Sequence, residues 1–151
     1  MPKASVKRKI ECNKDQLIDL VLDIEKYPQF VPFCLNAKIY EKKNKGDLIF
    51  IIADLTIGKG PFKDTYKSDV KLNKKKDTIH VTNLDGPLKH LENNWHFKED
   101  NNITEVSFDV DFELKNDFLN IIMTKSFQFG LDKIADAFQK RAEDLFGNSN
   151  N

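Results

Sequence analysis

The segment from Val106 to Leu114 alternates strictly between apolar and polar side chains. Its apolar positions are Val106, Phe108, Val110, Phe112 and Leu114, and the positions between them are Ser107, Asp109, Asp111 and Glu113. A period of two places all the apolar side chains on one face of an extended chain and the polar ones on the other. The pattern predicts an antiparallel strand with one face in the core.

The residues that follow have the spacing of one long amphipathic helix. Asn116 or Asp117 can cap its first turn, and Gly147 favours its end. The apolar stripe is wide enough to cover a sheet. It consists of Phe127, Leu131, Ile134, Phe138, Ala142 and Leu145.

The N-terminal part of the chain predicts a strand and two short helices. The strand spans about Ser5–Cys12, and Asn13 or Asp15 can cap the helix after it. This helix should end at Tyr27-Pro28, because proline disfavours helical geometry in the preceding residue. The proline-bounded segment Pro28–Cys34 is expected to form the second helix.

Six further strands are expected between these helices and the C-terminal one, joined by short turns that favour antiparallel neighbours. The order predicts an α+β fold of the helix-grip type, with a seven-stranded antiparallel sheet curled around a long C-terminal helix. We expect one domain over residues 1–147 and a disordered tail over 148–151. The six strands span about Asn36–Lys42, Asp47–Ile57, Phe62–Leu72, Thr78–Asp85, Leu91–Glu99 and Ile103–Leu114.

Composition and charge narrow the class of protein. The 151 residues carry 24 basic and 24 acidic side chains, a balance unlike that of a general nucleic-acid-binding protein, although local patches could still bind phosphate, and no DNA partner is expected. No run of 18 apolar residues is present, and the basic N-terminus lacks the apolar stretch of a secretory signal. Cys12 and Cys34 form no CxxC pair and are expected to be reduced thiols in a cytoplasmic protein.

No motif for catalysis or metal binding is found. The spacing of His80, His90 and His96 matches no metal signature, and His80 and His96 alternate with apolar residues, which predicts that they point outward. Nucleophile-elbow, zinc-protease, dinucleotide and P-loop motifs are absent. We therefore expect no catalytic residues, no bound metal and no cofactor.

Several polar side chains fall on strand faces that should point inward. Tyr66, Asn83 and Asn93 share those faces with apolar residues, and so does Asp64. One interpretation is that they bond each other or water, as most buried polar groups do. The other is that Tyr66, Asn83 and Asn93 hold the polar atoms of a ligand in an apolar cavity. No acid–base partner supports a catalytic role for Asp64.

An enclosed space between the sheet and the long helix would suit a lipophilic ligand. Aromatic side chains are concentrated where such a space should be lined or closed, although packing in the core also explains them. The predicted lining comprises Tyr27, Phe30, Phe33, Leu55, Ile57, Tyr66, Val70, Val81, Asn83, Asn93, Trp95, Phe97, Phe108, Val110, Phe127, Leu131, Ile134 and Phe138. A lid is expected from Tyr27–Cys34 with the turn Gly58–Pro61.

Four segments together resemble the coenzyme Q-binding, START-like family, which includes bacterial ribosome association toxins. They are Asp23–Cys34, Gly86–Trp95, Val106–Leu114 and Ala137–Gly147, and the similarity covers about residues 3–147. The chain has Phe33-Cys34 where the family often has Trp-Cys, and Leu88 where it often has Phe. The resemblance implies a non-enzymatic lipid-binding domain tied either to ubiquinone handling or to binding of the large ribosomal subunit.

Three hypotheses follow. The first is a carrier or chaperone for a polyprenyl quinone that meets the inner face of a bacterial inner membrane transiently. The second is a translation inhibitor that binds the large ribosomal subunit through lysine-rich turns at one end of the sheet. The third, an enzyme like the aromatase/cyclase proteins of this fold, lacks a catalytic constellation. The lysines of the second hypothesis, which an anionic membrane could also engage, are Lys42, Lys43, Lys45, Lys74, Lys75 and Lys76.

Overall fold

The computed structural model describes residues 3–59, 62–85, 88–115 and 117–147. Within these ranges it leaves the side chains at 59, 62, 85, 88, 114 and 117–127 undescribed. The predicted tail over 148–151, the alternative cap Asn116 and the lid residues Gly60 and Pro61 lie outside the described residues.

Within the described residues, seven strands form one antiparallel sheet in the order β1-β7-β6-β5-β4-β3-β2. Consecutive strands from β2 to β7 pair as neighbours, and β1 closes the order by pairing with β7. The predicted helix-grip fold is confirmed. The strands are β1 (Lys3–Ile10), β2 (Cys34–Lys45), β3 (Leu48–Lys59), β4 (Phe62–Asn73), β5 (Thr78–Asp85), β6 (Leu88–Asp100) and β7 (Ile103–Leu114).

The helix α1 (Lys14–Leu22) begins where the sequence predicts and ends earlier. Asn13 is its cap, because the Asn13 side chain accepts a hydrogen bond from the Gln16 backbone N–H at 2.8 Å and the Gln16 side chain accepts one from the Asn13 N–H at 3.2 Å. The expected end at Tyr27-Pro28 is wrong, since the chain leaves helical geometry at Asp23, where ψ is 62°.

A 3-10 helix, η1 (Ile24–Gln29), follows α1 and contains Pro28. The expected second helix over Pro28–Cys34 is therefore misplaced by about one turn. Phe30 to Phe33 form turns instead, and Phe33 has the left-handed φ of 70°. A short 3-10 helix tolerates proline because few of its backbone N–H groups have intrahelical partners.

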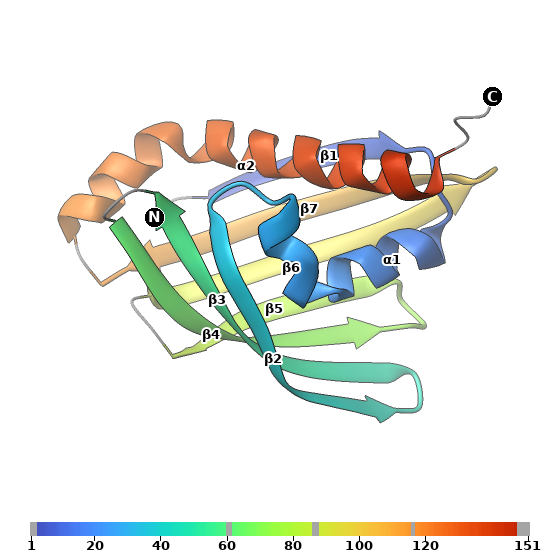
Figure 1. The fold of residues 1–151 in the computed structure, drawn as a ribbon, viewed down its shortest axis with the longest axis horizontal. Coiled ribbons are helices and arrows are strands. Elements are labelled where there is room, and N and C mark those ends of the chain that lie inside the picture. Colours follow the sequence, from blue (N-terminus) through green and yellow to red (C-terminus); the bar gives the residue numbers. More distant parts are fainter. Residues whose placement is uncertain (1–2, 60–61, 86–87, 116, 148–151) are drawn as a thin grey trace.

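The long helix α2 (Asp117–Phe146) lies across the concave side of the curled sheet, alongside β1 and β7 (Figure 1). The helices α1 and η1 close the same side farther along the sheet (Figure 1). Leu131, Phe138 and Ala142 of the predicted stripe are buried. Leu145 is wrongly placed in it, because Leu145 is 54% exposed and its neighbour Phe146 packs against the core.

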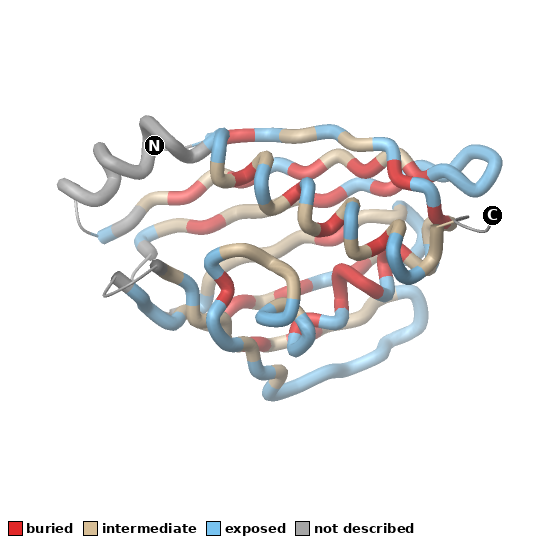
Figure 2. Tube along the Cα trace, turned by 45° about the horizontal axis from the view of Figure 1, so that its top comes forward, coloured by how far each residue is buried: buried red, intermediate tan, exposed pale blue. Residues whose placement is uncertain are grey.

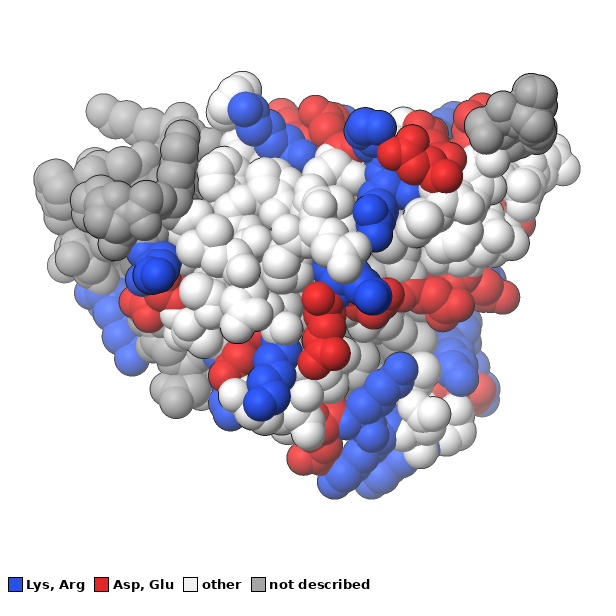
Figure 3. Space-filling view, in the orientation of Figure 1, with Lys and Arg blue, Asp and Glu red and all other residues white. Residues whose placement is uncertain are grey.

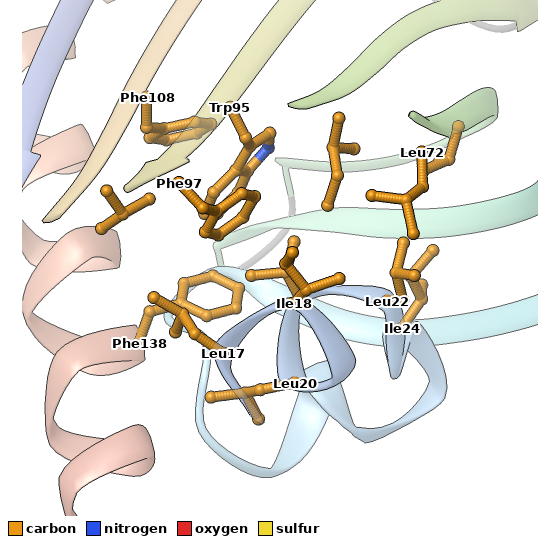
Figure 4. Packing of buried hydrophobic residues seen from close by; sticks show 14 of the residues in the cluster. Leu17, Ile18, Leu20, Leu22, Ile24, Leu72, Trp95, Phe97, Phe108 and Phe138 are labelled. Atoms are coloured by element: carbon orange, nitrogen blue, oxygen red, sulfur yellow. The ribbon is translucent and has the colours of Figure 1, made fainter. Parts of the chain in front are cut away.

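The core lies between the concave sheet face and these helices (Figures 2 and 4). Inward side chains form continuous rows across paired strands. One row runs through Ile51, Val70, Val81, Asn93 and Val110. His80 and His96 lie on the opposite face, as their alternation predicts, and His80 meets Glu92 at 2.9 Å.

Replacing Phe138 by Asp should unfold the domain under conditions in which the native protein is folded. Phe138 is buried against aromatic side chains of η1 and β6. Loss of a buried Phe costs about 3–5 kcal/mol even to alanine, and an unpaired buried carboxylate adds to that cost. Chemical denaturation followed by circular dichroism measures the change.

Phe129→Asp is the matched control, since Phe129 lies on the same helix and is 65% exposed. It should change stability by no more than about 0.5 kcal/mol. Equal stability of the two variants would contradict the orientation of α2 described here.

Candidate ligand site between the sheet and the long helix

Three aromatic rings join the long helix to the segment that follows α1. Phe138 of α2 meets Tyr27 of η1 and Phe30 edge to face, with ring centroids 5.4 and 5.2 Å apart. Tyr27 and Phe30 are themselves 6.1 Å apart. Edge-to-face packing is a favoured geometry for aromatic pairs, so this contact stabilises the closed position of residues 27–30.

The same Phe138 ring also reaches the sheet. Trp95 of β6 lies 5.4 Å from Phe138, 4.1 Å from Phe108 of β7 and 6.1 Å from Phe97. Figure 4 shows these four side chains pointing toward one another from α2 and the two strands. Six of the predicted lining residues therefore form one aromatic cluster, consisting of Tyr27, Phe30, Trp95, Phe97, Phe108 and Phe138.

A small cavity lies beside this aromatic cluster, between α2 and the sheet. It has a volume of about 20 Å³ and an apolar lining that includes Trp95, Phe108, Ile134 and Phe138. Arg8 of β1 also lines it. That volume is about the space of one water molecule. A larger ligand therefore needs α2 or residues 27–30 to move away from the sheet.

Two arginines hold α2 in place. From β1, Arg8 Nη2 donates to Asp136 Oδ1 at 2.9 Å. On α2 itself, Arg141 Nη2 donates to Gln29 Oε1 at 2.9 Å, and its guanidinium lies 5.1 Å from the Phe30 ring centre. The Nε atoms of both arginines are buried without a hydrogen-bond partner among the described residues.

The predicted lid segment, Tyr27–Cys34, is fastened at both ends. The Tyr27 hydroxyl donates to the Val21 carbonyl, and burial raises the pKa of Tyr27, which keeps the hydroxyl protonated. At the other end, the Gly58 N–H donates to the Phe33 carbonyl at 2.9 Å. Cys34 is a free, buried thiol, and burial raises its pKa to about 11, which keeps it unreactive at neutral pH.

The inward polar residues differ from one another. Asn83 Oδ1 accepts a hydrogen bond from the Leu91 N–H at 3.0 Å, which continues the pairing of β5 with β6. Asn93 Oδ1 is buried and has no hydrogen-bond partner among the described residues, although Asn93 lies between Val81 and Val110 in the inward row. An unpaired buried amide is costly, so Asn93 is the stronger candidate for a ligand contact.

Tyr66 and Asp64 occupy the same strand, β4, in different surroundings. Tyr66 packs against the core, and burial raises the pKa of its hydroxyl to about 12. Asp64 is exposed and accepts a hydrogen bond from the Thr65 N–H at 2.9 Å. Only Tyr66 of this pair is placed to meet a ligand inside the domain.

The other predicted lining residues fall into three groups. Val70, Val110 and Leu131 are buried in the core, and Leu55, Val81 and Ile134 pack against it. Phe33 of the lid segment and Ile57 of β3 are 40% and 39% exposed, and the side chain of Phe127 lies outside the described residues. Contact of any of them with a ligand stays a prediction.

The six predicted partner-binding lysines are all exposed at one end of the sheet. The Lys74 N–H donates to the Asp47 carbonyl at 2.8 Å, which holds the β4–β5 turn against the β2–β3 turn. Lys75 and Asp47 form an ion pair at 3.6 Å. We call this surface the basic tip, formed by Lys42, Lys43, Lys45, Lys74, Lys75 and Lys76.

Reasoning from the sequence missed Arg8 and Arg141. One signal was available, because they are the only arginines among 24 basic residues. The planar guanidinium can bond and stack at once, which lysine cannot do. Their partners on other elements could not be identified without the fold.

The described ranges contain no group of three His, Cys, Asp or Glu side chains placed to hold a metal ion. Among the described helices, none is both long enough and apolar enough to cross a membrane.

Comparison with known proteins identifies the family. Residues 10–139 match the model of the family described as polyketide cyclase / dehydrase and lipid transport. The mitochondrial coenzyme Q-binding protein COQ10 of Dictyostelium discoideum is 33% identical over 139 residues, which cover 90% of this chain and 66% of that protein. The ribosome association toxin RatA of Rickettsia prowazekii is 31% identical over 134 residues, which cover 86% and 88%.

A solved structure supports the same assignment. The solution structure of the 18 kDa protein CC1736 from Caulobacter crescentus superposes with a TM-score of 0.79 at 27% identity, covering 96% of this chain and 98% of that one. The chain therefore belongs to the START-like polyketide cyclase / dehydrase and lipid transport family.

Proposed function

We propose that the protein binds a polyprenyl quinone of the ubiquinone type beneath α2 and acts, without catalysis, as its carrier or chaperone in support of respiratory electron transport. The observation that carries the proposal is the buried Asn93 Oδ1, which has no hydrogen-bond partner among the described residues, beside an apolar, aromatic interior. The similarity to a protein named for coenzyme Q binding supports the choice of ligand.

The chemistry of the interior suits both parts of such a ligand. Each CH₂ of the isoprenoid tail that leaves water contributes about 0.8 kcal/mol. Trp95, Phe108 and Phe138 offer ring faces and edges against which a quinone ring can stack. The Asn93 amide has an acceptor oxygen for a quinol hydroxyl and, turned over, a donor for a quinone carbonyl.

Binding in this mode requires the protein to open. A cavity of about 20 Å³ cannot admit a quinone ring. Movement of the lid segment away from Phe138 and Arg141 would break contacts confined to Tyr27, Phe30 and Gln29. We infer that the ligand replaces these contacts and that loading takes place at a membrane surface.

A second candidate function, association with the large ribosomal subunit, has separate support. The basic tip offers six exposed lysines at a distance from the interior site, and one relative is named a ribosome association toxin. Phosphates of RNA are the complementary partner of such a surface.

Protein purified from a ubiquinone-producing host should release a quinone into organic solvent, detected by mass spectrometry. Protein purified from a host that makes no quinone should take quinone up from loaded vesicles. Absence of quinone from both preparations would contradict the proposal.

The variant Asn93→Leu should bind less quinone than the native protein. It should be as stable as the native protein or more stable by about 1 kcal/mol, because it removes a buried amide oxygen that has no partner. Asn83→Leu is the matched control, and it should lower stability because the Leu91 N–H loses its partner. Melting and bound quinone are measured on the same samples. Full quinone occupancy in the Asn93 variant would exclude a contact of its amide with the ligand.

Changing Lys74, Lys75 and Lys76 to Glu should preserve the fold, because exposed turn residues usually alter stability by no more than about 0.5 kcal/mol each. The same variant should pellet less with ribosomes, and quinone binding should be unaffected. Unchanged co-sedimentation at several salt concentrations would remove the basic tip from the second candidate function.

A further inference from the structure

Positive charge is concentrated on about a quarter of the chain. Residues 36–76, which contain β2, β3 and β4, include 11 lysines and five acidic residues, a net charge of +6. The rest of the chain carries −6, because the total is zero. Lysine side chains gather over the β2–β3 hairpin at the bottom of Figure 3. The end of β2 and the turn after it, residues 40–47, are exposed (Figure 2).

The aromatic side chain of Tyr40 lies among these lysines on the outer face of the sheet. The β2–β3 register shifts between Ile39 and Glu41, which leaves Tyr40 as the extra residue of a bulge. Tyr40 is 53% exposed. The Nζ atoms of Lys38 and Lys67 lie 5.1 and 4.6 Å from its ring centre.

Asp54 of β3 lies near the hydroxyl of this ring. A hydrogen bond between the Asp54 side chain and the Tyr40 hydroxyl raises the pKa of Tyr40, so the phenol is neutral at physiological pH. Farther along the same outer face, Lys71 Nζ lies 5.5 Å from the ring centre of Phe50. The face therefore has two aromatic rings, each accompanied by lysine, and continues into the basic tip.

We propose that the outer face of β2–β4 binds an unpaired loop of structured RNA, with Tyr40 as a stacking platform for a base and Lys38, Lys67 and the basic tip as phosphate contacts. This inference deepens the second candidate function and is independent of the interior ligand site. An exposed aromatic ring among cations on a sheet surface can stack on unpaired bases, whereas paired bases cannot reach the ring.

A membrane fits this face less well than RNA does. Insertion into a lipid surface needs exposed apolar side chains beside the positive charge. Those side chains, Phe33, Leu35 and Ile57, lie at the start of β2 and the end of β3, at the other end of the strands from the basic tip. Base stacking is also stronger than an exposed cation–π contact, so a base can displace either lysine toward a phosphate.

The test measures binding of a fluorescent RNA hairpin with an unpaired loop, by anisotropy, at several salt concentrations. Tyr40→Ala should weaken binding about tenfold, and Tyr40→Phe should restore it, because stacking needs the ring and not the hydroxyl. Lys67→Ala should lower the salt slope by about 0.7 if that lysine meets a phosphate of a single strand.

Phe129→Ala is the matched control. Phe129 is also exposed, and Lys133 Nζ lies 4.8 Å from its ring centre, but it belongs to α2. It should leave RNA binding unchanged. A fully paired duplex, which hides its bases, should bind more weakly than the hairpin.

Each of the following binding results would overturn the proposal: equal binding of hairpin and duplex, hairpin affinity unchanged in Tyr40→Ala, or an effect of Tyr40→Ala on anionic vesicles and not on RNA. Ribosome pelleting is measured in parallel. Tyr40-dependent hairpin binding without pelleting would support the RNA face and overturn the second candidate function. Pelleting that does not depend on Tyr40 would support that function and overturn the RNA face.

Discussion

Packing of one long helix against the concave face of the sheet is the constraint on which the rest of the structure depends. The sheet has an apolar face that must leave water, and α2 covers it from β1 to the lid segment. Phe138 is the central contact, because its ring meets η1, the turn after it and β6 at once. Arg8 and Arg141 then fasten the helix to β1 and to η1.

This packing also determines what ligand binding costs in free energy. Among the described residues, the side chains of the aromatic cluster pack against one another, and the cavity beside them has a volume of about 20 Å³. A ligand gains from burying its own apolar surface but must first separate rings such as Phe30 and Phe138. The unpaired oxygen of Asn93 lowers the stability of the folded domain, and a hydrogen-bond donor on a ligand would relieve this cost. Removing the Asn93 amide should therefore raise the stability of the domain and lower its affinity for the ligand.

The two candidate functions use opposite faces of one sheet. Alternation along each strand sends apolar side chains inward and charged ones outward, so changes on one face leave the other intact. Tyr40 and Phe50 are exceptions, because both rings lie on the charged face, Tyr40 at the β2 bulge and Phe50 on β3. The arrangement allows an interior lipid site and an outer RNA face in one domain without overlap.

The sequence by itself determined the elements whose pattern is local. The alternation from Val106 to Leu114, the cap at Asn13 and the stripe through Leu131 and Phe138 were all predictable, because periodicity and capping depend on residues close in the chain. Together with the resemblance to a known family they also predicted the fold.

Only the tertiary structure decided the matters that depend on distant partners. Asn83 and Asn93 look alike in sequence, yet one meets the Leu91 N–H and the other has its oxygen left unpaired, because strand register decides which amide finds a donor. The contacts of Arg8 and Arg141 depend on where α2 packs. The exposure of Leu145 depends on where α2 ends, and the outward position of Tyr40 depends on the bulge in β2. The local pattern of residues does not predict such contacts, because they join residues far apart along the chain.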